Sequence, residues 1–348
     1  RARLLLEKEL AKRQVAIKKP VIISDKKSPI EVILAVWNQQ TDAIDLVLTQ
    51  KSGKTLKLKS KFDWPVKVEI DNGVNSRYSL PVESRSFVVG EIGPVLSQGT
   101  VKRKKAYQLK DVVYIPYSPI FYTPEVLASG SDYLSFLIRD AFDEIRRKKV
   151  RSKAFPDKLL ADAVDPYLMK SIAVIEHSDS GIFGDDAPEK SLGKFLITLA
   201  LNHKDAFNFS VSSAGASGLF QFIPSTYKLV VKKRPELGLI PDFNQGMTDH
   251  RNAIKAQIAL LDMEMATMPG AIKAQNNTPA SAEYLAAAYN GGSSRVRKAI
   301  AALGPNWFQS TKEEVDKLID RVEGFKQQVR DHRTESGANQ DGENIADA

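Results

Sequence analysis

The pattern of apolar and polar side chains changes once along the chain, from β-type alternation to helical spacing. In residues 45–60, DLVLTQKSGKTLKLKS, apolar and polar side chains alternate on both sides of a Ser52-Gly53 turn, which predicts a β-hairpin. Further strands are predicted over three segments: 66–74 with an Asn72-Gly73 turn, 86–92 and 110–117. Prolines at positions 116, 119 and 124 end this region, because proline cannot donate to a sheet ladder.

The spacing becomes helical after residue 125. Residues 131–150 carry apolar side chains at helical spacing and end in basic residues, which suit a helix C-terminus. Asp165 followed by Pro166 predicts a helix start, and a second capped helix is predicted to begin near Asp249. Another helix is predicted from Thr278-Pro279 to the glycines at 291 and 292. The predicted fold class is α+β, with a small N-terminal antiparallel β domain followed by an all-α domain.

These patterns divide the chain into four predicted parts. They are a basic lead segment 1–28, a β domain 29–125, a helical domain 126–332 and a tail 333–348. The tail is polar and contains no aromatic residue, so we expect it to be disordered. We expect the β domain to serve as a cell-wall or substrate-binding module.

Composition excludes several kinds of chemistry. The 348 residues include no cysteine, which excludes disulfide scaffolds, thiolate zinc sites, iron–sulfur clusters and cysteine nucleophiles. The four histidines are widely separated in the sequence, so we expect no metal site and no cofactor. No run of eighteen or more apolar residues occurs, and we therefore expect no transmembrane segment.

The net charge of +8 is unevenly distributed. Residues 1–153 carry 29 basic and 17 acidic side chains, a balance of +12, whereas residues 154–348 carry 21 basic and 25 acidic side chains, a balance of −4. The front half therefore suits an anionic partner, although a solvated lysine-rich surface would have the same composition. The basic stretches 101–108 and 145–153 lack interleaved aromatic residues, and we expect no nucleic-acid partner.

One carboxyl group stands out by its position on a predicted helix. Leu168, Ile172 and Glu176 follow one another at intervals of four residues, which places Glu176 on the apolar face of the helix that starts at Pro166. Apolar surroundings disfavour the charged carboxylate and raise its pKa, as a general acid near neutral pH requires. The alternative is a glutamate at the helix end that is solvated or bonded to a partner.

Four separated motifs then give the chain a family resemblance. After the helix-terminal Glu176 come GASGLFQ and IPST within residues 215–226, a D-x-x-N helix start at 249–252, and AYNGG at 288–292. In this order they resemble the lytic transglycosylase and goose-type lysozyme family over about residues 160–305. The resemblance implies a lysozyme-like catalytic domain that acts on peptidoglycan glycan strands.

The resemblance also implies roles for particular residues. Glu176 would be the catalytic acid that protonates the β-1,4 glycosidic oxygen between N-acetylmuramic acid and N-acetylglucosamine. In transglycosylases the same carboxylate then acts as base on the C6 hydroxyl of the sugar and releases a 1,6-anhydro product. Residues of the substrate groove would be Ser212, Gly218, Phe220, Gln221, Tyr289 and Asn290. The glycine would let the backbone approach the substrate, and the phenylalanine would line the groove in place of the family's methionine.

Two departures from the family pattern leave alternatives open. His177 stands where the family has serine, and it could bind substrate, hold Glu176 or be an ordinary hydrogen-bonded histidine. An insert, residues 177–211, lengthens the stretch between Glu176 and Gly218 to 41 residues. Its Asp185 or Asp186 could position a water molecule, as hydrolytic members require, or could be a solvated turn residue.

We expect a lytic transglycosylase, with a hydrolytic muramidase as the alternative. The acidic insert would favour de-N-acetylated peptidoglycan, which presents ammonium groups. A non-catalytic cell-wall binding protein with the same fold is a more distant alternative. We expect a monomer that is periplasmic or secreted.

Overall fold

The computed structural model describes residues 1–16, 29–71, 73–101, 104–177, 188–212, 214–273, 284–285, 288 and 293–303. The predicted tail 333–348 and most of the helix predicted to start at Thr278-Pro279 lie outside these residues. The chain divides into two compact units. The first comprises Arg1–Gly130 with Ile197–Phe209, and the second comprises Ser131–Leu196 with Ser210–Ala348.

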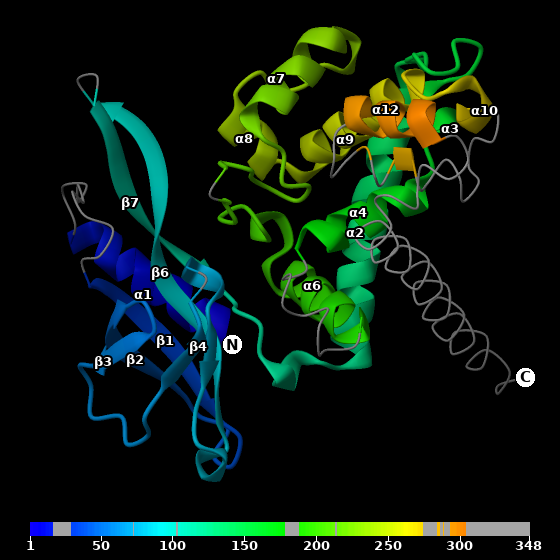
Figure 1. Cartoon of the computed structure of the whole chain (residues 1–348). Helices are drawn as coiled ribbons and strands as arrows, with labels where there is room; N and C mark the ends of the chain where they lie inside the picture. Colours follow the sequence, from blue (N-terminus) through cyan, green and yellow to red (C-terminus); the bar gives the residue numbers. More distant parts are fainter. Residues whose placement is uncertain are drawn as a thin grey trace, which may run out of the picture. The chain divides into compact units, whose positions relative to one another are not determined.

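The first unit contains an antiparallel sheet with the strand order β3-β2-β1-β6-β7 (Figure 1). Its strands are β1 (Ile30–Asn38), β2 (Ile44–Ser52), β3 (Thr55–Leu58), β6 (Ser86–Val101) and β7 (Lys104–Tyr114), and β4 (Lys67–Ile70) pairs with β5 (Arg77–Ser79) in a second sheet. The predicted hairpin is β2–β3, whose strands end at the paired residues Ser52 and Thr55. Gly53 in its turn has a φ of +56°, a conformation that favours glycine.

Strand β1 is the centre of the first unit because both of its faces are buried. Val32, Leu34 and Val36 belong to one apolar cluster, whereas Ile33 and Ala35 belong to another. Two buried faces explain why this strand reads as a nearly continuous apolar run. Helix α1 (Ala2–Ala16) contacts β1, β6 and β7, and its fully buried Leu6 joins the second cluster.

The hairpin of β6 and β7 is longer than the sequence pattern predicts. The first part of β6 pairs with β1 as far as Ile92. Beyond that residue β6 pairs only with β7, and this pairing continues to Val101 and Lys104. The predicted strand 86–92 is therefore present and continues to Val101, whereas the predicted strand 110–117 begins earlier, at Lys104, and ends earlier, at Tyr114. Of the basic stretch 101–108, Val101 belongs to β6 and residues 104–108 belong to β7.

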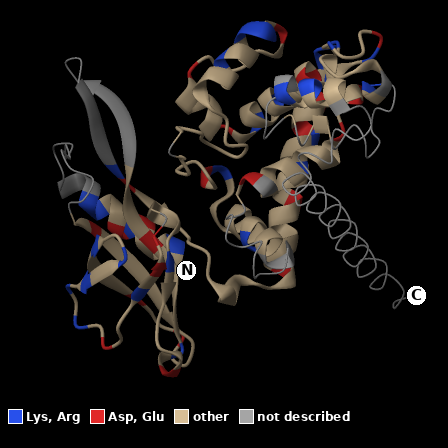
Figure 2. Cartoon of the chain, in the orientation of Figure 1, with Lys and Arg blue, Asp and Glu red and all other residues tan. Residues whose placement is uncertain are grey.

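The second unit is helical and is organised around α9 (His250–Ala266). Its other helices are most of α2 (Pro124–Arg147), α3 (Leu160–Ala163), α4 (Pro166–Glu176), the start of α6 (Pro188–Asn202), α7 (Pro224–Lys233), α8 (Phe243–Thr248), α10 (Gly270–Lys273) and α12 (Ser293–Leu303). Helix α9 contacts α3, α4, α7 and α8, and every one of its residues from Asn252 to Asp262 is buried. Basic residues end α7, as the dipole of a helix favours (Figure 2).

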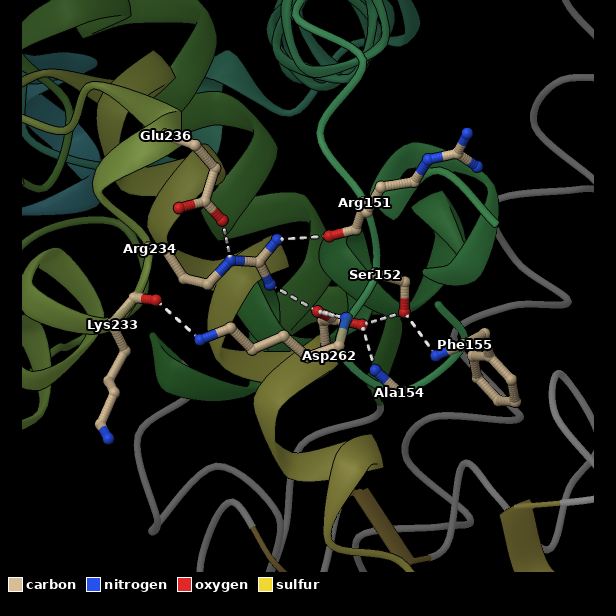
Figure 3. A network of polar contacts seen from close by, with 9 residues as sticks. Arg151, Ser152, Ala154, Phe155, Lys233, Arg234, Glu236 and Asp262 are labelled. Carbon is tan, nitrogen blue, oxygen red and sulfur yellow. Dashed lines mark hydrogen bonds and ion pairs between the residues drawn. The ribbon is translucent and has the colours of Figure 1, made fainter. Parts of the chain in front are cut away.

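A buried ion pair joins three segments of the helical unit (Figure 3). Arg234 follows α7 and donates through Nη1 to Asp262 of α9 at 2.5 Å, and both side chains are fully buried. Asp262 also accepts hydrogen bonds from the Ser152 hydroxyl and from the backbone N–H groups of Lys153 and Ala154. These bonds compensate the buried charges and fix the segment after α2.

Helix α6 begins in the helical unit and ends in the β unit. The division falls between Leu196 and Ile197. In the β unit, the buried Asn202 side chain accepts from the backbone N–H of Ile115 and donates to its carbonyl oxygen, both at 2.9 Å. The predicted insert 177–211 therefore contributes residues to both units.

The α+β fold class is confirmed: an N-terminal antiparallel sheet is followed by a helical region. In the part of the chain that the structure describes, no helix has the length and apolar character needed to cross a membrane.

Candidate active site

Helix α4 carries the candidate acid at its last position. The helix starts as predicted, because the Asp165 carboxylate accepts a hydrogen bond from the Tyr167 N–H at 2.9 Å beside Pro166. Leu168 and Ile172 are buried at 5% exposure each, so the stripe that ends at Glu176 does face the interior.

Glu176 itself is partly buried, and burial raises the pKa of its carboxyl to about 7. The raised pKa that the sequence predicts is therefore confirmed. Among the described residues, none forms an ion pair with this carboxyl group or donates a hydrogen bond to it. A carboxyl group that is half protonated near pH 7 can release a proton and later take one back.

His177 follows Glu176 and points its ring toward the glycine-rich loop, the segment after Ser212 that contains Gly215 and Gly218. Its Nε2 lies 3.1 Å from the carbonyl oxygen of Leu219. Since a carbonyl oxygen can only accept, Nε2 carries the proton. The ring also stacks on Phe195 of α6, with centroids 6.1 Å apart and planes 25° apart. Burial lowers the pKa of His177 to about 4, which keeps the ring neutral at neutral pH.

The glycine-rich loop is closed by its own backbone. The N–H of Ser212 donates to the carbonyl of Ala216 at 2.9 Å, and the N–H of Ala216 donates to the Ser212 hydroxyl oxygen at 3.0 Å. Short β-bridges join Ser217 to Val211 and to Phe222. Ser212 is exposed, and its hydroxyl can still donate its proton to a ligand.

Two loop residues have different surroundings from those we expected. Gly218 has a φ of +77°, and a Cβ atom there would lie 2.5 Å from the carbonyl oxygen of Met247 in α8. Glycine is thus needed because the loop approaches α8, and its expected role toward the substrate stays a prediction. Phe220 is fully buried, so in this conformation it supports the loop from within and does not line a groove.

Gln221 is held in a strained but well-supported conformation. Its φ of +45° is unusual for a residue with a side chain. Its side-chain Nε2 donates to the carbonyl oxygens of Gly218 at 3.0 Å and Ser210 at 3.3 Å. These bonds orient the amide and leave its Oε1 as an acceptor on a partly exposed side chain.

The D-x-x-N motif supports the helices beneath this loop. The Asp249 carboxylate caps α9 by accepting from the N–H of Asn252 at 2.8 Å, which confirms the predicted helix start. The buried Asn252 side chain donates to the Tyr227 hydroxyl and to the carbonyl of Gly246, and it accepts from the N–H of Ile240. The motif therefore fixes the packing of α7, α8 and α9.

The remaining candidate residues lie outside the described residues. These are Tyr289, Asn290, Asp185 and Asp186. Their proposed roles stay predictions. Conversely, sequence reasoning did not single out Phe195 or Met247, because nothing in the local sequence indicates which apolar residue contacts a loop.

Residues 204–306 match the family model of the transglycosylase SLT domain. The helical part of the chain therefore contains an SLT domain. The match confirms the family resemblance and supports a peptidoglycan-degrading activity of the lytic transglycosylase type. The match covers the glycine-rich loop and begins at residue 204, within the insert 177–211, so it does not include Glu176 or His177. No curated protein matches the chain.

Proposed function

We propose that the protein is a lytic transglycosylase that cleaves the β-1,4 bond between N-acetylmuramic acid and N-acetylglucosamine, with Glu176 as its acid and base. The observation that supports this most directly is the Glu176 carboxyl group, whose pKa burial raises to about 7. The residue after it is hydrogen-bonded to the glycine-rich loop of the SLT domain. A raised carboxyl pKa beside that loop is what a single-acid mechanism requires.

The reaction needs one proton that leaves and returns. Protonated Glu176 gives its proton to the glycosidic oxygen as the bond from C1 of the muramic acid residue to that oxygen breaks. The resulting carboxylate then accepts the proton of the C6 hydroxyl on the same sugar, and the C6 oxygen forms the new bond to C1. Water is not consumed, and Glu176 ends the cycle protonated, as it began.

Loop residues supply groups that can bind the sugar. The exposed Ser212 hydroxyl is a donor, and the Oε1 of Gln221 is an acceptor held in place by the two bonds to its amide nitrogen. By resemblance, Tyr289 and Asn290 would complete the wall of the groove. Since peptidoglycan lies outside the cytoplasmic membrane, we propose that the protein acts in the periplasm or after secretion.

Mass spectrometry of digested peptidoglycan sacculi tests this proposal. We expect glycan fragments that end in 1,6-anhydro-muramic acid, lighter by one water than the corresponding reducing ends. The Glu176→Gln variant should release no fragments, because glutamine cannot transfer the proton. Fragments with reducing ends would instead identify a muramidase, and their loss in Asp185→Asn or Asp186→Asn would assign the water-positioning carboxylate. Wall binding without any cleavage by the unmodified protein would point to a non-catalytic wall-binding protein.

A second comparison addresses the form of the substrate. The acidic residues of the insert would attract the ammonium groups of de-N-acetylated peptidoglycan. We therefore expect faster release of fragments from de-N-acetylated than from acetylated sacculi. Equal rates, or slower cleavage after deacetylation, would contradict this preference.

A further inference from the structure

His177 connects the candidate acid to two other parts of the helical unit. We propose that His177 is a positioning residue. It holds the end of α4 against the glycine-rich loop, so that the Glu176 carboxyl group keeps its position relative to the sugar-binding groups of Ser212 and Gln221. The inference rests on the proposed function of Glu176. It assigns His177 a task within the protein rather than in binding the substrate.

The hydrogen bond to Leu219 joins two segments that are far apart in the sequence. Leu219 is fully buried and lies in the sequence between Gly218 and Gln221, so the bond anchors His177 to a buried part of the loop. This acceptor is a backbone group of the segment that carries Gln221, and the position of the ring therefore fixes that segment relative to α4.

Stacking on Phe195 restrains the ring from its other side. Phe195 is buried at 3% exposure in α6, and the two rings are close to parallel. The backbone adds a further restraint, because the N–H of His177 donates to the carbonyl of Val174 at 3.1 Å and closes the last turn of α4. A side chain held by a donor bond, a ring contact and its own backbone has little freedom to reach a substrate.

Glu176 depends on this arrangement because it shares a peptide unit with His177. A shift of the ring would move the last turn of α4 and, with it, the carboxyl group relative to Ser212 and Gln221. A misplacement of about 1 Å in a catalytic group can cost about 100-fold in rate. The proposal therefore predicts a loss in kcat without a comparable change in KM.

Three substitutions separate the hydrogen bond from the ring contact. Glutamine places its amide nitrogen as many bonds from Cα as Nε2 of histidine, so His177→Gln can keep the donor. His177→Phe keeps a ring for Phe195 but has no donor, and His177→Ala removes both. Val230→Ala, at a fully buried position in α7, serves as a control of reduced stability that leaves the His177 contacts intact.

The variants are compared in the full chain by their kinetics on sacculi. We expect kcat to fall by about 10- to 100-fold in His177→Ala and His177→Phe, with KM within about threefold of the parent value. His177→Gln should recover kcat to within about threefold. An equal loss in the Gln and Phe variants, a change in KM alone, or the same loss in Val230→Ala would overturn the proposal. If His177→Ala does not fold, the difference in kcat between His177→Gln and His177→Phe decides whether the hydrogen bond positions Glu176.

Hydrogen exchange gives a readout that does not depend on activity. Amides of residues 214–222 should exchange at least tenfold faster in His177→Phe than in His177→Gln or the parent. Unchanged exchange would refute the positioning role even if activity were lost. Conversely, a parent protein that does not cleave sacculi would refute the proposed function, and the exchange result would still decide whether His177 holds the loop.

Discussion

Replacing Glu176 by glutamine should abolish cleavage and, above neutral pH, make the protein more stable. Burial raises the pKa of this carboxyl from 4.5 to about 7, so the folded protein binds its proton more tightly than the unfolded chain does. The stability that this proton provides is complete below pH 4.5. It declines as the pH rises toward 7, because the folded state must then hold a poorly solvated carboxylate.

The size of the effect follows from the shift. One pKa unit corresponds to about 1.4 kcal/mol, so a rise from 4.5 to about 7 sets an upper limit of about 3 kcal/mol above pH 7. Glu176 is partly exposed, and we expect solvent to reduce this to about 1–3 kcal/mol. Glutamine has nearly the same shape and no charge, so Glu176→Gln should be stabilised by this amount at pH 8 and by little at pH 4.

Thermal unfolding at pH 4 and pH 8 measures the difference. At pH 8, we expect the transition of the helical unit to rise by about 2–10 °C in Glu176→Gln. Asp157→Asn, which removes an exposed carboxylate from the same unit, is the control and should show no such pH dependence. A Glu176→Gln variant that is equally stable as the parent at pH 8, or less stable, would show that Glu176 does not hold a buried charge.

Three further predictions concern the same unit. The kcat/KM for sacculi should fall about tenfold per pH unit above pH 7 in a rate–pH profile, since Glu176 must start protonated; a flat profile to pH 9 would contradict this. In urea unfolding, Gly218→Ala should lower the free energy of unfolding by about 2–4 kcal/mol, because φ is +77° and the new Cβ would lie 2.5 Å from a carbonyl oxygen. Gly215→Ala, at a φ of +79° with open space around the new Cβ, should lower it by only about 1 kcal/mol, and equal losses would refute the steric argument. Asp262→Ala should lower the free energy of unfolding by about 3–5 kcal/mol, because it removes the buried partner of Arg234 and leaves the guanidinium group only the exposed Glu236 as a carboxylate partner; urea unfolding would reveal a smaller loss if water reached the guanidinium group.

Local signals explain which parts of the fold were predictable. The start of α4 at Pro166 and of α9 after Asp249 depend on caps within three residues, and both predictions are confirmed. The outer half of the β6–β7 hairpin was not predicted, because residues 93–101 include Gly93 and Pro94 and lack a regular alternation. There the strands are defined by pairing with each other, which one segment of sequence does not reveal.

The sequence predicted which residues belong to the candidate site better than it predicted what surrounds them. The four-residue spacing that ends at Glu176 predicted its partly buried position and raised pKa, because helix geometry alone decides which face it shares. For Gly218 and Phe220, the motif gave the residues but not their contacts with α8 and the core. Those contacts join elements from different parts of the chain and depend on tertiary packing.

The insert between the acid and the loop need not disrupt the chemistry. Of the 41 residues between Glu176 and Gly218, residues 188–202 form helix α6, so the longer connection is ordered in part and still returns the chain to the loop that His177 contacts. A short connection would fix the position of Glu176 relative to the glycine-rich loop more accurately than this longer one does. The bond from His177 to Leu219 restores that constraint directly beside Glu176, at the position where a short connection would have acted. A histidine in place of the family's serine is therefore consistent with the presence of the insert, since its longer side chain reaches a loop carbonyl and α6 at once.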